Sequence, residues 1–123
     1  MEKSTLDELM PLKIRKPTDL EIKLIEILIK KSSLEFINWK DSLMVEPIDD
    51  GNMGSLTLLP NGYYAKKKRS LKQISEYEFL DLDGVLVSVA LYIDRMSGEL
   101  YELDIWKVNF EPLIEINIDN ILL

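Results

Sequence analysis

Residues 85–93, VLVSVALYI, form an almost wholly apolar run that stands between two turn sequences. Residues 81–84 (DLDG) precede it and residues 94–98 (DRMSG) follow it, and both carry the acidic and glycine residues typical of hairpin turns. The segments beyond these turns, EYEFL and ELYELDIWK, show the alternation of β-strands. The pattern predicts a three-stranded antiparallel meander. Its central strand is apolar at nearly every position, which predicts that both of its faces are covered.

A helix is predicted upstream of this meander. Thr18 and Glu21 match a capping box, in which the hydroxyl and the carboxylate satisfy each other's free backbone N–H groups. Apolar residues then recur at helical spacing, and Lys30 and Lys31 lie where the helix dipole favours cations, so the helix should end at about Lys31. Ser33 is placed to cap a second short helix that runs towards Leu43.

Turn residues punctuate the remaining chain, and the segments between them predict strands. The expected strands are 43–48, 55–59, 72–80, 85–93 and 99–106, with 112–118 as a candidate for a last one. We expect an α+β fold in which one or two N-terminal helices pack on an antiparallel sheet of four to six strands. Residues 1–16 should form a loosely ordered N-terminal segment, and residues 17–123 a single domain.

Alternation along the strand 99–106 separates two sets of side chains. Leu100, Glu102, Asp104 and Trp106 should share one face, and Glu99, Tyr101, Leu103 and Ile105 the other. The second set is the expected core face, because it carries more apolar surface. Trp106 then stands beside two acidic residues, where a tryptophan serves as an anchor for a binding partner. Trp39, in the second predicted helix, fits the core as well as an interface.

The charge and the missing residue types exclude much chemistry. The 123 residues contain 15 basic and 22 acidic side chains, a net charge of −7, which favours a basic partner and opposes nucleic acid or an anionic membrane. The chain has no cysteine and no histidine, so it lacks disulfides, thiolate nucleophiles and the commonest general base and metal ligand. No cofactor is expected.

The expected location is cytoplasmic. The N-terminal sequence lacks the basic start and continuous apolar core of a signal peptide, and no apolar stretch approaches the roughly 20 residues that a membrane-spanning helix needs. Towards the other end, the alternating Ile114, Ile116 and Ile118 permit pairing with the sheet or with a second subunit, so a homodimer is compatible with the sequence.

The segment from Asp49 to Ser55, DDGNMGS, is rich in carboxylate and amide oxygens, which are ligands for a hard cation such as Ca²⁺. Its spacing does not match an EF-hand, because Leu56 and Leu58 follow at once where further oxygen ligands are required. A tight turn between strands, with its two glycines at positive φ, is the favoured interpretation.

A second group is Glu102, Asp104 and Lys107, which with Glu76 or Glu78 on a neighbouring strand resembles the acids and lysine of a magnesium-dependent hydrolase. The Glu-x-Asp spacing does direct both carboxylates to one face of the sheet. A solvated sheet face has the same alternation, however, and this simpler interpretation is preferred.

Two further groups carry weaker signals. Residues 63–69, YYAKKKR, join two aromatic rings to four cations, from Lys66 to Arg69, and offer a nucleic-acid contact, although the net charge opposes it. A basic edge that prevents sheet-to-sheet pairing explains them equally well. Ser55, Ser75 and Ser88 are not expected to act as nucleophiles, because no histidine is present to activate them.

Four segments together resemble a family of small bacterial domains of unknown function. They are residues 15–18 (RKPT), 49–56 (DDGNMGSL), 75–94 and 98–116, so the resemblance runs from about residue 15 to 116. The patterns Asp-Gly-x-Met-Gly-Ser and Glu-Leu-Asp-x-Trp-Lys carry it. The resemblance implies no catalytic residues. In size, charge and class, the chain is also similar to immunity proteins, which neutralise a toxin by covering its basic cleft.

The sequence thus favours a non-enzymatic module that binds a basic protein through an acidic sheet face. The candidate contact residues are Glu76, Glu78, Glu102, Asp104 and Trp106, with Asp49 and Asp50 at the rim. Acidic side chains on a rigid sheet can complement a positive cleft and speed association without any chemistry of their own. The alternative is a metal-dependent hydrolase that uses Glu102, Asp104 and Lys107.

Overall fold

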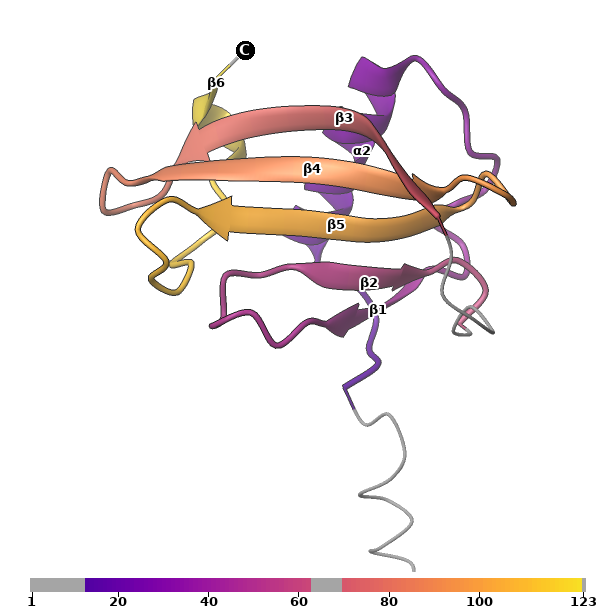
Figure 1. The fold of residues 1–123 in the computed structure, drawn as a ribbon, viewed down its shortest axis with the longest axis horizontal. Helices are drawn as coiled ribbons and strands as arrows, with labels where there is room; N and C mark the ends of the chain where they lie inside the picture. Colours follow the sequence, from indigo (N-terminus) through magenta and orange to yellow (C-terminus); the bar gives the residue numbers. More distant parts are fainter. Residues whose placement is uncertain (1–12, 63–69, 123) are drawn as a thin grey trace, which may run out of the picture.

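The computed structural model describes residues 13–62 and 70–122, the last three by their backbone alone. One helix, α2 (Asp19–Ser32), packs on a six-stranded antiparallel sheet of order β1-β2-β5-β4-β3-β6 (Figure 1). This confirms the predicted α+β class. The strands are β1 (Met44–Pro47), β2 (Leu56–Leu59), β3 (Leu71–Leu80), β4 (Leu86–Asp94), β5 (Leu100–Lys107) and β6 (Ile121–Leu122), and a short 3-10 helix, η1 (Ile118–Asn120), precedes β6.

Helix α2 begins at the predicted capping box. The Glu21 N–H donates to the Thr18 hydroxyl over 3.1 Å, and the Thr18 N–H donates to the Glu21 carboxylate over 2.9 Å. Glu21 has a second partner that the sequence did not reveal, because both of its oxygens accept hydrogen bonds from Arg15 at 2.9 Å. Arg15 also pairs with Val45 of β1 through two backbone hydrogen bonds, so the folded unit extends at least to this residue.

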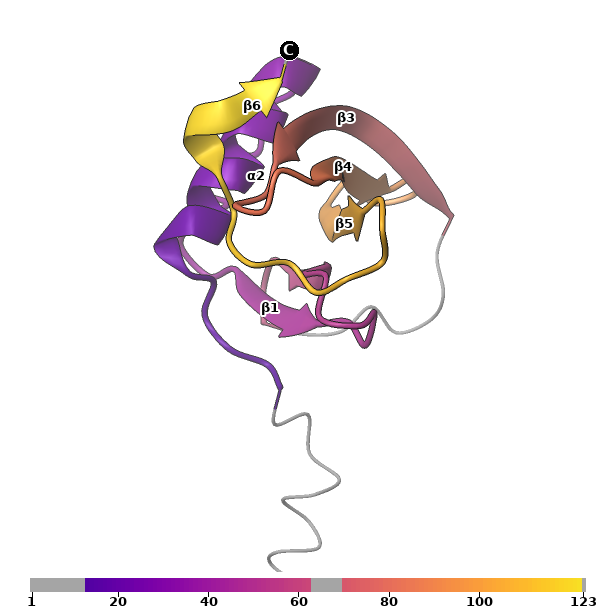
Figure 2. The same ribbon diagram turned by 90° about the vertical axis from the view of Figure 1, so that its left-hand side faces the viewer.

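The core lies between α2 and one face of the sheet. Figure 2 shows the sheet curving, with α2 along one side of it. Leu24, Ile25 and Leu28 of the helix are fully buried. They pack with the inward residues of the meander β3-β4-β5, which has the predicted order. The inward residues that are almost completely buried are Phe79, Val87, Val89, Leu91, Leu103 and Ile105.

The second predicted helix is wrong. Residues 37–41 form turns instead, with hydrogen bonds from the Trp39 N–H to the Phe36 carbonyl and from the Asp41 N–H to the Asn38 carbonyl. Ser33 has φ 65° and caps the end of α2, and Asn38 has φ 55°. Two residues in the left-handed region within this short stretch prevent a continuous right-handed helix. Their polar side chains are the kind that tolerate this conformation.

The candidate strand at 112–118 is wrong as well. Residues 111–117 have no strand pairing, and they cross one end of the sheet before the chain returns to β3 (Figure 2). The Ile114 and Glu115 N–H groups donate to the Asp81 carboxylate, and the Leu113 N–H donates to the Asn52 carbonyl. These hydrogen bonds occupy backbone N–H groups that would otherwise pair with a neighbouring strand. Pairing resumes only in β6, opposite Glu78 and Phe79.

Leu100 was assigned to the wrong face of β5. A bulge opposite Tyr92 and Ile93 places Tyr101 as an extra residue, so that Leu100 pairs with Ile93 and is buried in the core. From Glu102 onward the predicted alternation holds. Within the described ranges, no helix is long and apolar enough to cross a lipid bilayer.

Candidate functional site

The predicted contact residues of β3 and β5 converge on the sheet face that points away from α2. The register aligns Glu76, Ala90 and Asp104 in one row across β3, β4 and β5. The next row towards the end of β5 contains Glu78, Ser88 and Trp106. The row on the other side pairs Tyr92 with Glu102. We call Glu76, Glu78, Tyr92, Glu102, Asp104 and Trp106 the acidic face; it is turned towards the viewer in Figure 1.

The expectation that both faces of the central strand are covered is only half right. On the helix side, Val87, Val89 and Leu91 are inaccessible to solvent. On the acidic face, Ser88 and Tyr92 remain half-buried, and no element covers them among the residues that the structure describes. The short side chain of Ala90 is shielded by its neighbours on β3 and β5 rather than by a second layer. The acidic face is thus an open, shallow surface.

Negative charge is concentrated around Tyr92. Its hydroxyl donates to Gln73 Oε1 over 3.2 Å, and Gln73 Nε2 donates to Glu76 Oε1 over 3.3 Å. Burial raises the pKa of Tyr92, and the charges of Asp104, Glu102 and Glu76 raise it further. The tyrosine therefore lies within the field of three carboxylates. Tyr92 was not predicted from the sequence, because it is part of an apolar run. Its spacing of two and four residues from Ala90 and Ser88 would have placed all three side chains on the same face of the strand.

None of the four carboxylates of the acidic face forms an ion pair with a described lysine or arginine. Glu102 also makes no hydrogen bond to that part of the chain. Burial raises the pKa of Glu102, and the nearby charge of Asp104 adds to the effect. A raised pKa indicates that the surroundings disfavour the charged form. A cation supplied from outside would relieve this repulsion.

The loop 48–55 between β1 and β2 forms the predicted tight turn. Gly51, Asn52 and Gly54 have positive φ. The two oxygens of Asp50 accept hydrogen bonds from the Met53 N–H at 3.0 Å and the Ser55 N–H at 3.1 Å. Asp50 therefore holds the loop in shape. No group of three acidic side chains within the described ranges is arranged to hold a metal ion.

This loop contacts β5 just before β2 begins. β2 pairs with β5 only through Leu56 and Thr57. Beyond them the buried Ser55 replaces a strand residue, because its hydroxyl accepts from the Ile105 N–H over 2.8 Å and lies 3.1 Å from the Ile105 carbonyl. The Lys107 N–H then donates to the Met53 sulfur over 3.3 Å. Side chains thus take the place of the missing strand ladder.

A pocket of about 210 Å³ opens beside this junction. It brings together the two segments, 50–55 and 102–107, that carry the family resemblance. Of the predicted contact residues, Asp50, Glu102, Asp104 and Trp106 line it. Asp49 is exposed outside the pocket, and Glu76 and Glu78 lie across the sheet on β3. The remaining lining residues are Ile48, Met53, Ser55 and Ile105.

An aromatic pair stands at the same end of the sheet. Trp106 is 45% exposed and Phe110 is 67% exposed, and their ring centroids are 5.9 Å apart. Phe110, in the loop after β5, has φ 64°, a conformation that is uncommon for a bulky residue. Exposed aromatic residues of this kind are frequent anchors of protein interfaces. The sequence pointed to Trp106 but not to Phe110.

The hydrolase constellation is not assembled. Lys107 points to the opposite side of β5 from Glu102 and Asp104 and is only 1% exposed. Its ammonium group donates to Asp81 and Asp83, each over 2.8 Å, and to the Pro112 carbonyl over 3.2 Å. Three acceptors saturate a lysine ammonium group. Lys107 therefore serves the fold and is not directed towards the carboxylates of the acidic face.

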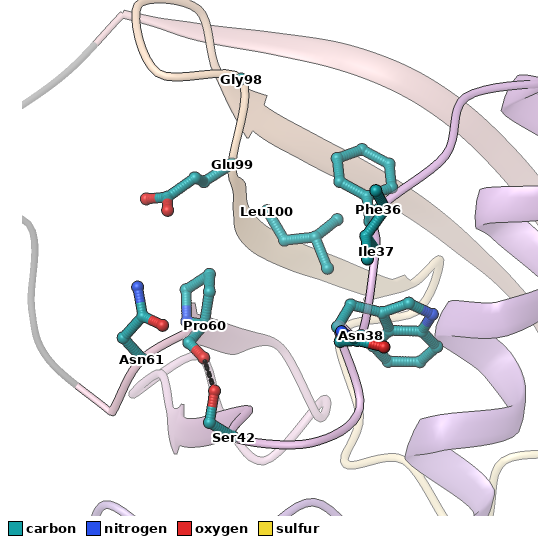
Figure 3. Close-up of a pocket in the computed structure, with 10 residues that line it drawn as sticks. Phe36, Ile37, Asn38, Ser42, Pro60, Asn61, Gly98, Glu99 and Leu100 are labelled. Atoms are coloured by element: carbon teal, nitrogen blue, oxygen red, sulfur yellow. Dashed lines mark hydrogen bonds between the residues drawn. The ribbon is translucent and has the colours of Figure 1, made fainter.

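A second pocket, of about 240 Å³, lies at the opposite end of the sheet (Figure 3). Leu100 lies between Pro60 on one side and Phe36 on the other. Ser42 closes part of the rim by donating a hydrogen bond of 2.6 Å to the Pro60 carbonyl. Trp39 lines this pocket and packs against the core, so its role is at least partly structural. Apart from Glu99, the predicted contact strands contribute no acid to it.

The remaining candidates do not form a site. Ser55 serves the strand junction, and the hydroxyl of Ser75 is buried without a hydrogen-bond partner among the described residues. Ser88 stands in the open row beside Trp106. The basic segment 63–69, with Lys66 to Arg69, lies outside the described residues, as does most of the N-terminal segment 1–16.

Fold and site together define a small α+β domain with an uncovered acidic sheet face and an adjacent pocket. Residues 14–117 match the model of a family described as a domain of unknown function (DUF6984), and the chain belongs to that family. The match confirms the resemblance to a small domain family whose function is not known. No curated protein and no solved structure matches the chain.

Proposed function

We propose that this protein is a non-enzymatic binding module that recognises a basic protein partner through the acidic face. The observation that carries the proposal is the alignment of four carboxylates on one open sheet face, none of them paired with a described cation. Folded proteins usually compensate charges that they gather in one place, unless a partner supplies the opposite charge.

The surroundings of these carboxylates support recognition rather than catalysis. The acidic residues extend from regular strands, which hold their positions before a partner arrives and reduce the entropy lost on binding. Their summed negative potential would steer a cationic surface towards the face. Trp106 and Phe110 add exposed aromatic area beside the charges. Exposed aromatic residues are enriched in specific protein interfaces, whose rims are polar.

The biological role that fits this surface is that of an immunity protein in the cytoplasm of a bacterium. Such a protein covers the basic substrate cleft of a toxin, and the acidic face has the charge required for that. This part of the proposal is supported by the size of the domain and by its net charge of −7. It predicts that co-expression of the protein protects cells from one particular toxin.

Charge reversal at matched positions tests the binding proposal. The partner is captured from a lysate of the native host, purified and titrated against three variants by calorimetry. Glu102→Lys and Glu78→Lys place a positive charge on the acidic face. Glu35→Lys makes the same change of charge in the exposed turn region after α2, away from the acidic face.

We expect the two reversals on the acidic face to weaken binding about tenfold or more, with a loss that shrinks as salt is added. The Glu35→Lys variant should bind within about twofold of the wild type. Equal affinities for all three variants, or a partner whose contact surface is acidic, would contradict the proposal.

A further inference from the structure

The pocket beside the strand junction has walls of two chemical kinds. Ile48 and Met53 provide apolar surface, whereas the side chain of Ile105 is buried in the core. Glu102 and Asp104 provide carboxylates two residues apart on the same strand face, and the indole of Trp106 also lines the pocket. A ligand that fits these walls needs an apolar stem and a cationic, planar head.

The carboxylates still have free capacity to accept hydrogen bonds. Glu102 has no hydrogen-bond or ion-pair partner among the residues that the structure describes. Asp104 Oδ1 lies 3.3 Å from the Ser55 hydroxyl, whereas Oδ2 has no described partner. Asp50 is engaged through both oxygens by the backbone of its own loop, so it adds negative charge and stays in place. The carboxylates of Glu102 and Asp104 can therefore both accept hydrogen bonds from a ligand in this pocket.

We propose that this pocket binds an arginine side chain of the basic partner, with its methylene groups on Ile48 and Met53 and its guanidinium group between the two carboxylates and the indole. The inference rests on the proposed function and names the residue type that the acidic face selects. A guanidinium group is planar, stacks on aromatic rings and donates in a fork to carboxylates.

Arginine fits better than lysine for two reasons. Its five donors can serve Glu102 and Asp104 at once, whereas a lysine ammonium group is a compact point charge that retains its water strongly. The guanidinium group is also the cation most often found over a tryptophan ring. The pocket, about 210 Å³ in volume and open on the acidic face, accommodates one such side chain.

Three short peptides test the inference directly, without the natural partner. They are acetylated and amidated tripeptides with glycine at both ends and arginine, lysine or citrulline in the middle. Citrulline has the shape of arginine without its charge. Binding is followed in the full-length protein by the NMR shift of the Trp106 indole N–H, which is assigned by its loss in the Trp106→Phe variant.

We expect the arginine peptide to shift the Trp106 signal and to bind at least about fivefold more tightly than the citrulline peptide, with the lysine peptide in between. Glu102→Gln and Asp104→Asn should each reduce this preference to about twofold or less. Glu78→Gln, which removes a carboxylate of the same face outside the pocket, should leave it intact.

Three outcomes would overturn the inference. They are arginine and citrulline peptides of equal affinity, a Trp106 signal that no peptide shifts, and an arginine preference that survives both pocket variants. Because Glu102→Gln changes a side chain without hydrogen bonds to described residues, it keeps the test valid even if Asp104→Asn disturbs the Ser55 junction.

The failure of this inference is distinguishable from that of the proposed function. If the acidic face binds a basic partner by its general charge alone, the charge reversals Glu102→Lys and Glu78→Lys weaken that partner equally while the peptides show no preference. If the proposed function itself fails, both reversals leave partner affinity unchanged, whatever the peptides do. The two experiments share no reagent except the wild-type protein.

Discussion

The charged side chains on the two sides of β5 differ in whether they have described partners of opposite charge. On the inner side, Lys107 is buried and donates to the carboxylates of Asp81 and Asp83. On the outer side, Glu102 and Asp104 have no described cation near them. Burial by itself would lower the pKa of Lys107, but the two carboxylates outweigh it and raise the value. For Glu102, burial and Asp104 both disfavour the charged form.

We interpret the buried charges on the inner side as stabilising the fold, and the carboxylates on the outer side, unpaired among the described residues, as binding a partner. Asp81 accepts hydrogen bonds from Lys107 and from the N–H groups of Leu82, Ile114 and Glu115. It thereby ties the β3–β4 turn, the end of β5 and the crossing segment together. Among the described residues, no comparable network involves Glu102. We expect the inner residues to determine stability and the outer residues to determine binding.

The largest effect should follow from Lys107→Met, which keeps an unbranched side chain of nearly the same length and removes its charge. Asp81 would be left buried without its cation, and removing one partner of a buried ion pair is strongly destabilising. We expect the melting temperature to fall by roughly 10 °C or more. Differential scanning calorimetry at pH 7 measures it.

Lys30→Met is the matched control, because Lys30 is exposed in the last turn of α2. Its melting temperature should lie within about 3 °C of the wild type. If Lys107→Met melted as close to the wild type as the control does, the inner cluster would not support the fold, and the contrast between the two sides of β5 would be lost.

Ser55→Ala should have the next largest effect. The substitution removes the acceptor of the buried Ile105 N–H, and a buried donor left without a partner costs about 1–3 kcal/mol. Urea unfolding measures the loss in free energy. Ser88→Ala on the acidic face is the control, since Ser88 makes no hydrogen bond to a described residue and should change stability by about 0.5 kcal/mol or less. Equal losses would show that the junction is not held by Ser55.

Much of the fold follows from local sequence signals. The capping box of Thr18 and Glu21 placed the start of α2, and turn residues placed five strands to within one or two positions. These features depend on neighbours in the chain. The misplaced Leu100 and the missing strand at 112–118 depend on a bulge and on the Asp81 carboxylate, which is more than 30 residues away from the segment that it binds. No local pattern carries that information.

The candidate site divides in the same way. Period-two alternation was enough to place Glu76, Glu78, Glu102, Asp104 and Trp106 on one face, since the register keeps parity across β3, β4 and β5. The hydrolase alternative grouped Lys107 with Glu102 and Asp104, although alternation places Lys107 on the other face of the strand, and its partners Asp81 and Asp83 were unknown without the tertiary structure. The pocket lies where the pairing of β2 with β5 stops at Leu56, a feature of the tertiary structure that residue types do not encode.

As the pH falls, Glu102 on the outer side should be protonated before Asp81 on the inner side, because the pKa of Glu102 is raised and that of Asp81 is lowered. Burial opposes ionisation of Asp81, but hydrogen bonds from Lys107 and from backbone N–H groups outweigh it and lower the pKa below the ordinary value near 4. A lowered folded-state pKa adds stability above about pH 4, and this contribution is lost as the pH falls through the folded-state pKa.

Asp81→Asn should therefore flatten the dependence of unfolding free energy on pH below about pH 4, because the titrating group is gone. Urea unfolding of both proteins between about pH 2 and pH 6 gives the two slopes. Parallel slopes would mean that carboxylates elsewhere account for the acid sensitivity, and Asp81 would lose its place at the centre of the inner network.

The smallest effect, and the one of opposite sign, is expected for Glu102→Gln. The raised pKa of Glu102 means that its charge destabilises the folded state near pH 7, and the effect disappears in acid as the carboxyl becomes protonated in both states. Solvent screens a half-exposed group, so removing the charge should stabilise the domain by about 0.5 kcal/mol or less at pH 7 and by nothing near pH 3. Urea unfolding at both pH values, with Glu78→Gln as the control, measures this gain. A loss of stability would place Glu102 among the groups that hold the fold. A small gain, together with weaker binding of the partner, would show that this side chain costs stability and is kept for recognition.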